Sequence, residues 1–209
     1  MLKYERSIEN LYFGERTNNM NTKKVVIVMG SPRKKGNSAT LAHRVAEGAK
    51  AAGADVESLY LHEMNIKPCN ACDICREDTA IDCNINDDME ELYPKLRQAD
   101  ALVIASPIYW FTVAAQTKLF MDRLYALGGP QGNALKGKRI GIVLTYGDTD
   151  PFSSGAINAL RTFQDAFAYI GSNIVDMVYG SASEPGEIKM NHDLMEKAYI
   201  MGKRLVTEV

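Results

Sequence analysis

The four cysteines are the residues whose spacing points most directly to chemistry. They form the pattern Cys69-x2-Cys72-x2-Cys75-x7-Cys83 and are the whole cysteine content of the chain. Thiolates three residues apart can converge on one metal centre, and a compact group of four suits a cubane [4Fe–4S] cluster. A loop of free thiols is the main alternative. Zinc is less favoured because its structural sites usually pair two separated knuckles, and disulfides are disfavoured in a reducing compartment.

A second group of polar residues follows the apolar run that ends at Met29. It reads Gly30-Ser31-Pro32-Arg33-Lys34-Lys35-Gly36-Asn37-Ser38 and leads into a predicted helix. The loop offers hydroxyl groups, an amide and three cations, and its glycines leave backbone N–H groups accessible at the start of the helix. These groups are suited to binding a phosphate dianion. It lacks the glycine spacing of a dinucleotide fingerprint and the ending of a Walker loop. An ordinary polar turn is the alternative, but such a turn needs no such density of donors.

Two further loops carry groups that complement a phosphate site. The segment from Ser106 to Thr112 contains Tyr109, Trp110 and Phe111, which could line a flat apolar ligand or pack against the core or a partner subunit. A polar loop from Thr145 to Pro151 contains Gly147, which permits close backbone approach. Together the three loops outline a site for a mononucleotide with a flat ring.

The elements that must position these loops alternate between strand and helix. An apolar, β-branched run predicts a strand over 25–29, and further strands are predicted over 55–60, 101–105, 139–144 and 173–178. Helical periodicity predicts helices over 38–52, 87–97, 113–127, 154–170 and 191–206, while 61–86 reads as irregular. Five buried strands separated by helices indicate an α/β, doubly wound parallel sheet covered on both faces. Ligands of such sheets bind beyond the carboxyl ends of the strands.

Composition excludes several classes of function. The chain is 46% hydrophobic and 24% charged with a net charge of −2, which argues against a nucleic-acid or membrane-surface binder. The apolar runs are too short to span a bilayer and no secretory signal is visible, so we expect a cytoplasmic protein. Residues 9–14 resemble a protease-recognition tag that lacks one residue. We therefore interpret 1–19 as an appended or disordered tail and 20–209 as one domain.

These residues also carry a resemblance to a known family. The first loop, Gly30 to Ser38, and the motif from Ser106 to Trp110 with Lys118, Phe120, Met121, Asp122 and Arg123 closely resemble the NAD(P)H-dependent FMN reductases. The resemblance implies a flavodoxin-like sheet of order 2-1-3-4-5 that binds FMN. Because FMN carries the chemistry, no side chain is expected to be catalytic. The implied cofactor site comprises Ser31, Arg33, Lys35, Gly36, Asn37 and Ser38 at the phosphate, Pro107, Ile108, Tyr109 and Trp110 at the ring, and Thr145, Tyr146 and Gly147 in the third loop.

The cysteine run followed by Asp87-Asp88-Met89 resembles the iron–sulfur flavoprotein branch of the same superfamily. Two functions follow. One is an NAD(P)H-dependent reductase of flavins, quinones or similar small acceptors. The other is an electron carrier in which a cluster held by the cysteines receives electrons from a protein donor such as ferredoxin. The resemblance also implies a homodimer or homotetramer with an interface near the flavin. Asp122 and Arg123 are expected to form helix or interface ion pairs and are left out of the site.

Overall fold

The computed structural model describes residues 22–77, 82–130 and 132–207, so the proposed tail 1–19 lies outside the described residues. Its larger sheet is built on five parallel strands in the order β2-β1-β3-β7-β8, the predicted flavodoxin-like order 2-1-3-4-5. These strands are β1 (Lys24–Met29), β2 (Asp55–Tyr60), β3 (Ala101–Tyr109), β7 (Arg139–Tyr146) and β8 (Asn173–Ser181).

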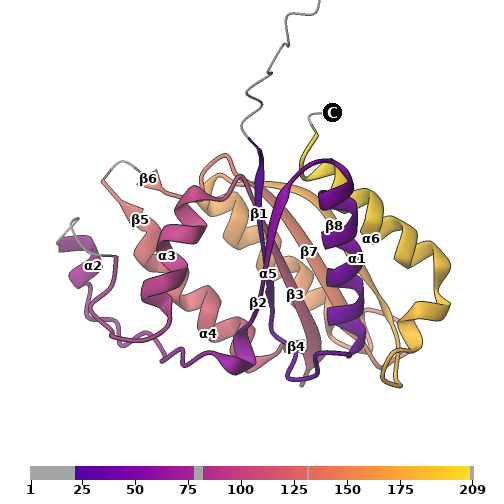
Figure 1. Cartoon of the computed structure of the whole chain (residues 1–209). Coiled ribbons are helices and arrows are strands. Elements are labelled where there is room, and N and C mark those ends of the chain that lie inside the picture. The colour runs from indigo at the N-terminus through magenta and orange to yellow at the C-terminus, as the bar shows by residue number, and fades with distance from the viewer. Residues whose placement is uncertain (1–21, 78–81, 131, 208–209) are drawn as a thin grey trace, which may run out of the picture.

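Helices cover both faces of this sheet, as alternation along the buried strands requires (Figure 1). On β1, Val25, Ile27 and Met29 pack with α1 (Asn37–Ala51) and α6 (His192–Arg204). Val26 and Val28 point to the other face. That face is covered by three helices: α3 (Met89–Gln98), α4 (Ala115–Arg123) and α5 (Ala156–Ile170).

Short elements complete the described chain. One-turn helices are η1 (Leu61–Glu63), α2 (Ile74–Glu77), η2 (Leu124–Leu127) and η3 (Glu187–Met190). A small ribbon pairs β5 (Gly128–Gly129) with β6 (Gly132–Asn133), and β4 (Thr112–Val113) folds back on β3. No helix among the described residues has the length and apolarity to cross a membrane.

The sequence expectations differ from the structure mainly in two segments. The third strand continues beyond Ala105 to Tyr109, so part of the expected loop is a β-hairpin. Residues 61–86, expected to be irregular, contain η1 and α2. Both differences lie beside the residues that the sequence singled out for chemistry.

Candidate functional site

The three predicted loops meet at one edge of the sheet. They follow β1, β3 and β7, which are neighbouring parallel strands whose carboxyl ends therefore lie side by side (Figure 1). Strand β2 lies on one side of β1, and the next strand along the chain, β3, lies on the other side, so the strand order reverses between β1 and β3. Doubly wound sheets bind their ligands at such a reversal.

The first loop curls tightly into the start of α1. The buried Ser31 hydroxyl accepts a hydrogen bond from Arg33 N at 3.1 Å, and Gly36 N donates to Arg33 O at 2.9 Å. Gly36 is the N-cap of α1, no side chain caps the helix, and its first turn holds no acidic residue. The N–H groups of the first turn are thus available to an anion, as a phosphate site requires.

The three cations of this loop differ in their partners. Lys34 forms an ion pair with Glu63 at 2.6 Å and lies over the Tyr60 ring. Arg33 and Lys35 are exposed and have no ion-pair partner within the described part of the chain. These two cations remain available to a phosphate group.

The Asn37 side chain connects this loop to the chain that follows β8. Its Nδ2 donates to Ala182 O at 3.1 Å and Glu184 O at 2.9 Å, while its Oδ1 accepts from Gly186 N at 2.8 Å. Ile188 N also donates to Oδ1, at 3.3 Å. Because its amide is engaged in this way, the role of Asn37 in the proposed phosphate site is assigned to its backbone N–H.

The second loop is a two-residue hairpin of unusual composition. Tyr109 pairs with Thr112 across β3 and β4, and the two residues between them, Trp110 and Phe111, have φ angles of 50° and 67°. Such turns normally use Asn-Gly, because left-handed backbone costs other residues about 1–2 kcal/mol each. The hairpin nevertheless presents Trp110 with 91% of its surface exposed. Strain of this kind at an exposed site indicates a functional constraint.

Residues at the start of α5 that the sequence did not single out hold this hairpin in place. Asn158 Nδ2 donates to Phe111 O at 3.2 Å. Gly155, with φ of 76°, packs so closely that a Cβ there would lie 2.6 Å from Phe111 Cα. The spacing of these residues in the sequence gives no signal of the contact, because it depends on how α5 packs against β4.

Hydroxyl groups fix the base of the hairpin. Ser106 is fully buried, and its Oγ accepts from Ala114 N at 3.0 Å and from Thr117 Oγ1 at 3.1 Å. Thr117 also lies against Gly30, where a Cβ would come 1.9 Å from its Oγ1. Pro107 and Ile108, expected at the flavin ring, are half-buried at the end of β3. Thr117 therefore contacts both the first loop, at Gly30, and the base of the second loop, at Ser106.

The third loop presents mainly its backbone. Thr145 and Tyr146 are buried, and burial raises the pKa of the Tyr146 phenol. Gly147 is exposed, and its carbonyl accepts from Ser183 Oγ at 2.9 Å. The structure thus brings the predicted residues of all three loops to one edge, but directs two of the third loop's side chains into the protein.

The four cysteines line a single cavity together with residues of α4 and η2. Cys69 and Cys72 are exposed, whereas Cys75 and Cys83 are half-buried. Ala71 and Asp73 have φ angles of 54° and 57°, so the backbone turns sharply on either side of Cys72. Burial raises the pKa of the Cys75 thiol, and the nearby Cys83 adds to the effect.

This donor set fits an all-sulfur centre, because four thiols and no histidine face the cavity. Within the described ranges, however, no three His, Cys, Asp or Glu side chains are grouped closely enough to hold a metal ion. The thiols share a cavity without adopting a ligating arrangement. The cavity encloses only about 20 Å³, so binding of a cluster would require the loop to rearrange.

A buried ion pair lies beneath this loop. Arg123 binds Asp87, with Nη1 to Oδ2 at 2.5 Å and Nη2 to Oδ1 at 3.2 Å. Asp87 also accepts from Met89 N at the start of α3. Asp122 instead forms an exposed pair with Lys118 within α4. The expected helix pair is therefore confirmed for Asp122, whereas Arg123 pairs inside the protein with a residue 36 positions earlier.

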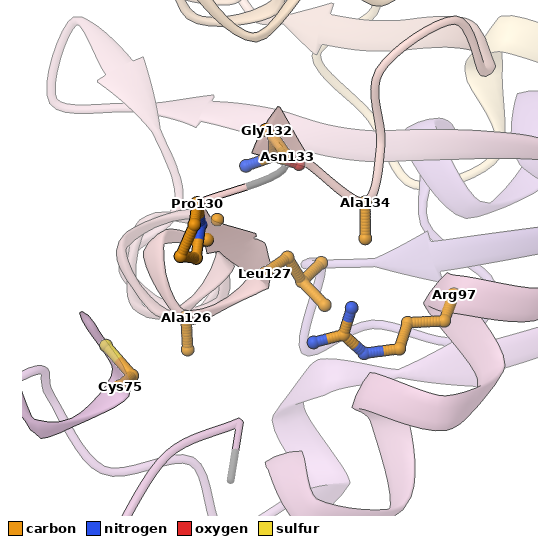
Figure 2. A pocket seen from close by; sticks show the side chains of 10 residues that line it. Cys75, Arg97, Ala126, Leu127, Pro130, Gly132, Asn133 and Ala134 are labelled. Carbon is orange, nitrogen blue, oxygen red and sulfur yellow. The ribbon is translucent and has the colours of Figure 1, made fainter. Parts of the chain in front are cut away.

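A larger cavity of about 480 Å³ lies on the other side of Cys75. Figure 2 shows Arg97 of α3 reaching toward Leu127, with Cys75 and Ala126 at the opposite side. Arg97 also forms an ion pair with Asp82, the residue before Cys83. Cys75 thus lines two cavities, and one of them contains all four thiols.

Comparison with known proteins agrees with this geometry. The model of the family described as NADPH-dependent FMN reductase matches residues 23–184. An iron–sulfur flavoprotein of Methanocaldococcus jannaschii is 29% identical over 89% of this chain and 97% of its own length. An iron–sulfur flavoprotein of Archaeoglobus fulgidus is 31% identical over 75% of this chain and 76% of its own length.

Solved structures share the fold. An NAD(P)H:quinone oxidoreductase from Methanothermobacter marburgensis superposes with a TM-score of 0.71 at 18% identity, over 90% of this chain and 99% of that one. A flavodoxin from the domain Archaea superposes with a TM-score of 0.55 at 12% identity, over 88% and 96%. The chain therefore belongs to the NADPH-dependent FMN reductase family and is an FMN-dependent NAD(P)H oxidoreductase, with iron–sulfur flavoproteins among its relatives.

Proposed function

We propose that FMN binds across the three loops and that Cys69, Cys72, Cys75 and Cys83 hold a [4Fe–4S] cluster beside it. The chain would then take electrons from NAD(P)H or a reduced ferredoxin and deliver them to a small acceptor such as a quinone or a free flavin. The observation that carries this proposal is the single cavity lined by all four thiols. The iron–sulfur flavoproteins among the relatives support it.

The chain's own residues have distinct roles in this proposal. Arg33, Lys35 and the first-turn N–H groups of α1 hold the FMN phosphate, while Ser31 shapes the loop. Backbone groups of the β3–β4 hairpin and of Gly147 border the ring, and Tyr109 and Trp110 cover part of it. Bound FMN supplies hydride and single-electron transfer, whereas a cluster supplies single electrons only.

Two further features belong to this proposal. Trp110 and Phe111 expose more apolar surface than a ring edge can cover, so we assign them to a homodimer or homotetramer interface next to the flavin. Four free thiols in one loop favour a reducing compartment such as the cytoplasm.

Anaerobic reconstitution with iron and sulfide tests the proposal. We expect about four irons and four sulfides per wild-type chain, with broad visible absorbance that dithionite bleaches. Cys72→Ala should lose this absorbance and keep FMN, because the phosphate loop is a separate segment. Asn70→Ala is the matched control, since Asn70 lines the same cavity without a thiol.

The electron donor is tested with the same proteins. Reduced ferredoxin should reduce FMN in the wild type and in Asn70→Ala but not in Cys72→Ala, whereas NADPH oxidation should persist in all three. Four titratable thiols and no bound iron in the wild type would contradict the cluster. The chain would then be an NAD(P)H-dependent reductase without a cluster. One zinc per chain would likewise contradict it.

A further inference from the structure

The buried network under the cysteine loop contains a donor that nothing in the described chain satisfies. Arg123 and Asp87 have side chains that are 1% and 0% exposed. Arg123 Nη1 also donates to Lys67 O at 2.9 Å, so both terminal nitrogens are engaged. Nε is buried and has no acceptor among the described residues. Buried N–H groups without acceptors are rare, and each one needs an explanation.

Arg123 also borders the cavity that the four thiols share. Tyr93 joins it there, since the buried Tyr93 hydroxyl donates to Arg123 O at 3.1 Å. Cys83 lines the same cavity as Arg123, so the buried network borders the thiol loop there.

We propose that Arg123 is a positioning residue for the cluster, placing a fixed positive charge and its unused Nε–H beside the cavity that Cys83 and the other three thiols line. This inference rests on the proposed function. Reduction adds negative charge to a cluster, and hydrogen bonds to its sulfurs stabilise the reduced form. Arg123 therefore raises the reduction potential. Asp87 holds the planar guanidinium through two hydrogen bonds, so that Nε stays directed away from the carboxylate.

A purely structural role is the competing explanation. In that case the pair would serve only to join α4 to the segment between Lys67 and Met89. Breaking the pair from either side would then have similar consequences. The two explanations differ in the sign of the effect on the cluster, because Arg123 and Asp87 carry opposite charges.

The test compares the reconstituted wild type, Asp87→Asn, and the double variant Asp87→Asn with Arg123→Gln. Lys118→Ala is the control, since Lys118 lies on the same helix in an exposed pair. Anaerobic redox titration followed by electron paramagnetic resonance measures the midpoint potential of the cluster. The midpoint potential of the double variant should be lower than that of Asp87→Asn by at least about 59 mV. For one electron this is a tenfold shift of the equilibrium toward the oxidised cluster. Asp87→Asn and Lys118→Ala should not shift in that direction.

If Asp87→Asn fails to fold, the double variant, which leaves no buried charge, is compared with the wild type directly. Its potential should still be lower than that of the wild type, because Arg123 lines the thiol cavity and Asp87 does not; an unchanged potential would overturn the inference. Equal potentials in the double variant and Asp87→Asn would overturn the inference while the cluster stands. A shift of Asp87→Asn in the same direction as the double variant would also overturn it, in favour of the structural role. Wild-type protein that takes up no iron would overturn both the inference and the cluster.

Discussion

Gly155 lies against Phe111 so closely that any side chain at position 155 would displace the β3–β4 hairpin. A Cβ there would meet Phe111 Cα and its carbonyl oxygen within 2.7 Å, and Gly155 also has a φ of 76°. The hairpin carries Tyr109 and Trp110 to the proposed flavin ring. The start of α5 thus sets the position of one wall of the site.

We expect Gly155→Ala to weaken FMN binding, because the alanine methyl must push Phe111 and its neighbours away. Gly137→Ala is the matched control, since Gly137 has a φ of 75° but nothing within 4 Å of a Cβ. Both variants should lose about 1–2 kcal/mol of stability from left-handed backbone. Only Gly155→Ala should show a reduced FMN affinity in fluorescence titration. Unchanged affinity in Gly155→Ala would mean that the hairpin does not border FMN.

The phosphate assignment is tested at the first loop. Arg33→Ala should weaken FMN binding by about 1.5–3 kcal/mol, the range for a hydrogen bond to a charged group. Lys34→Ala should change FMN affinity little, because Lys34 is already paired with Glu63. Riboflavin lacks the phosphate and should bind the wild type poorly. Equal affinities of the wild type for riboflavin and FMN would contradict the assignment.

Much of the fold follows from the sequence because its cause is local. Strands β1, β3 and β7 contain buried apolar runs and the helices follow a 3.6-residue period, so the spacing of apolar residues distinguishes these strands from the helices. The hairpin at Trp110 and Phe111 could not be predicted in this way, since neither residue favours the left-handed backbone that the turn adopts. Its shape depends on packing against α5, which no local pattern encodes.

The site was predictable to a similar extent. The positions of the three loops follow from strand order, but the partners of individual side chains do not. Asn37 resembles a phosphate ligand in sequence, yet its amide binds residues 145 or more positions away. Asp122 and Arg123 are adjacent, yet one is exposed and the other is buried against Asp87. Such long-range pairings depend on tertiary structure and cannot be predicted from the spacing of residues in the sequence.

The assembly prediction concerns the exposed tip of the hairpin. Trp110 and Tyr169 have 91% and 89% of their surfaces exposed, but Tyr169 lies at the far end of α5 from the flavin edge. We expect Trp110→Ala to favour the monomer in sedimentation velocity at micromolar concentration, and Tyr169→Ala to resemble the wild type. A wild-type protein that is itself monomeric under these conditions would refute the proposed interface.

The buried pair predicts a large and pH-dependent contribution to stability. Asp87→Ala should lower the free energy of unfolding by about 3–5 kcal/mol, because Arg123 is left as a buried charge without its partner. Asp122→Ala should cost less than about 1 kcal/mol, because its pair with Lys118 is exposed. Urea denaturation at pH 7 measures both values. Similar losses in the two variants would show that the buried pair stabilises the protein no more than the exposed pair does.

The pH dependence of this contribution has a definite sign. Burial alone would raise the pKa of Asp87, but hydrogen bonds from Arg123, Lys67 N and Met89 N lower it below its ordinary value. The contribution is therefore complete above the unfolded pKa of about 3.9 and is lost as the pH falls through the lower folded pKa. Wild-type stability should fall more steeply than that of Asp87→Ala in this acidic range.

The thiols of the cluster-free protein should differ in reactivity toward iodoacetamide. Cys72 is exposed, whereas Cys75 is half-buried and its pKa is raised by burial and by Cys83. Only the thiolate reacts, so Cys75 should be alkylated more slowly than Cys72 at pH 7.5. Its rate should keep increasing above the pH at which the rate of a free cysteine, with a pKa of about 8.5, has levelled off.

Mass spectrometry of peptides from timed samples resolves the sites. Urea-unfolded protein, in which the folded environment is gone, is the control, and there the two rates should converge. Equal rates in the folded, cluster-free protein would show that Cys75 is not shielded in the shared cavity. In the reconstituted protein, all four thiols should be protected from alkylation if they bind the cluster.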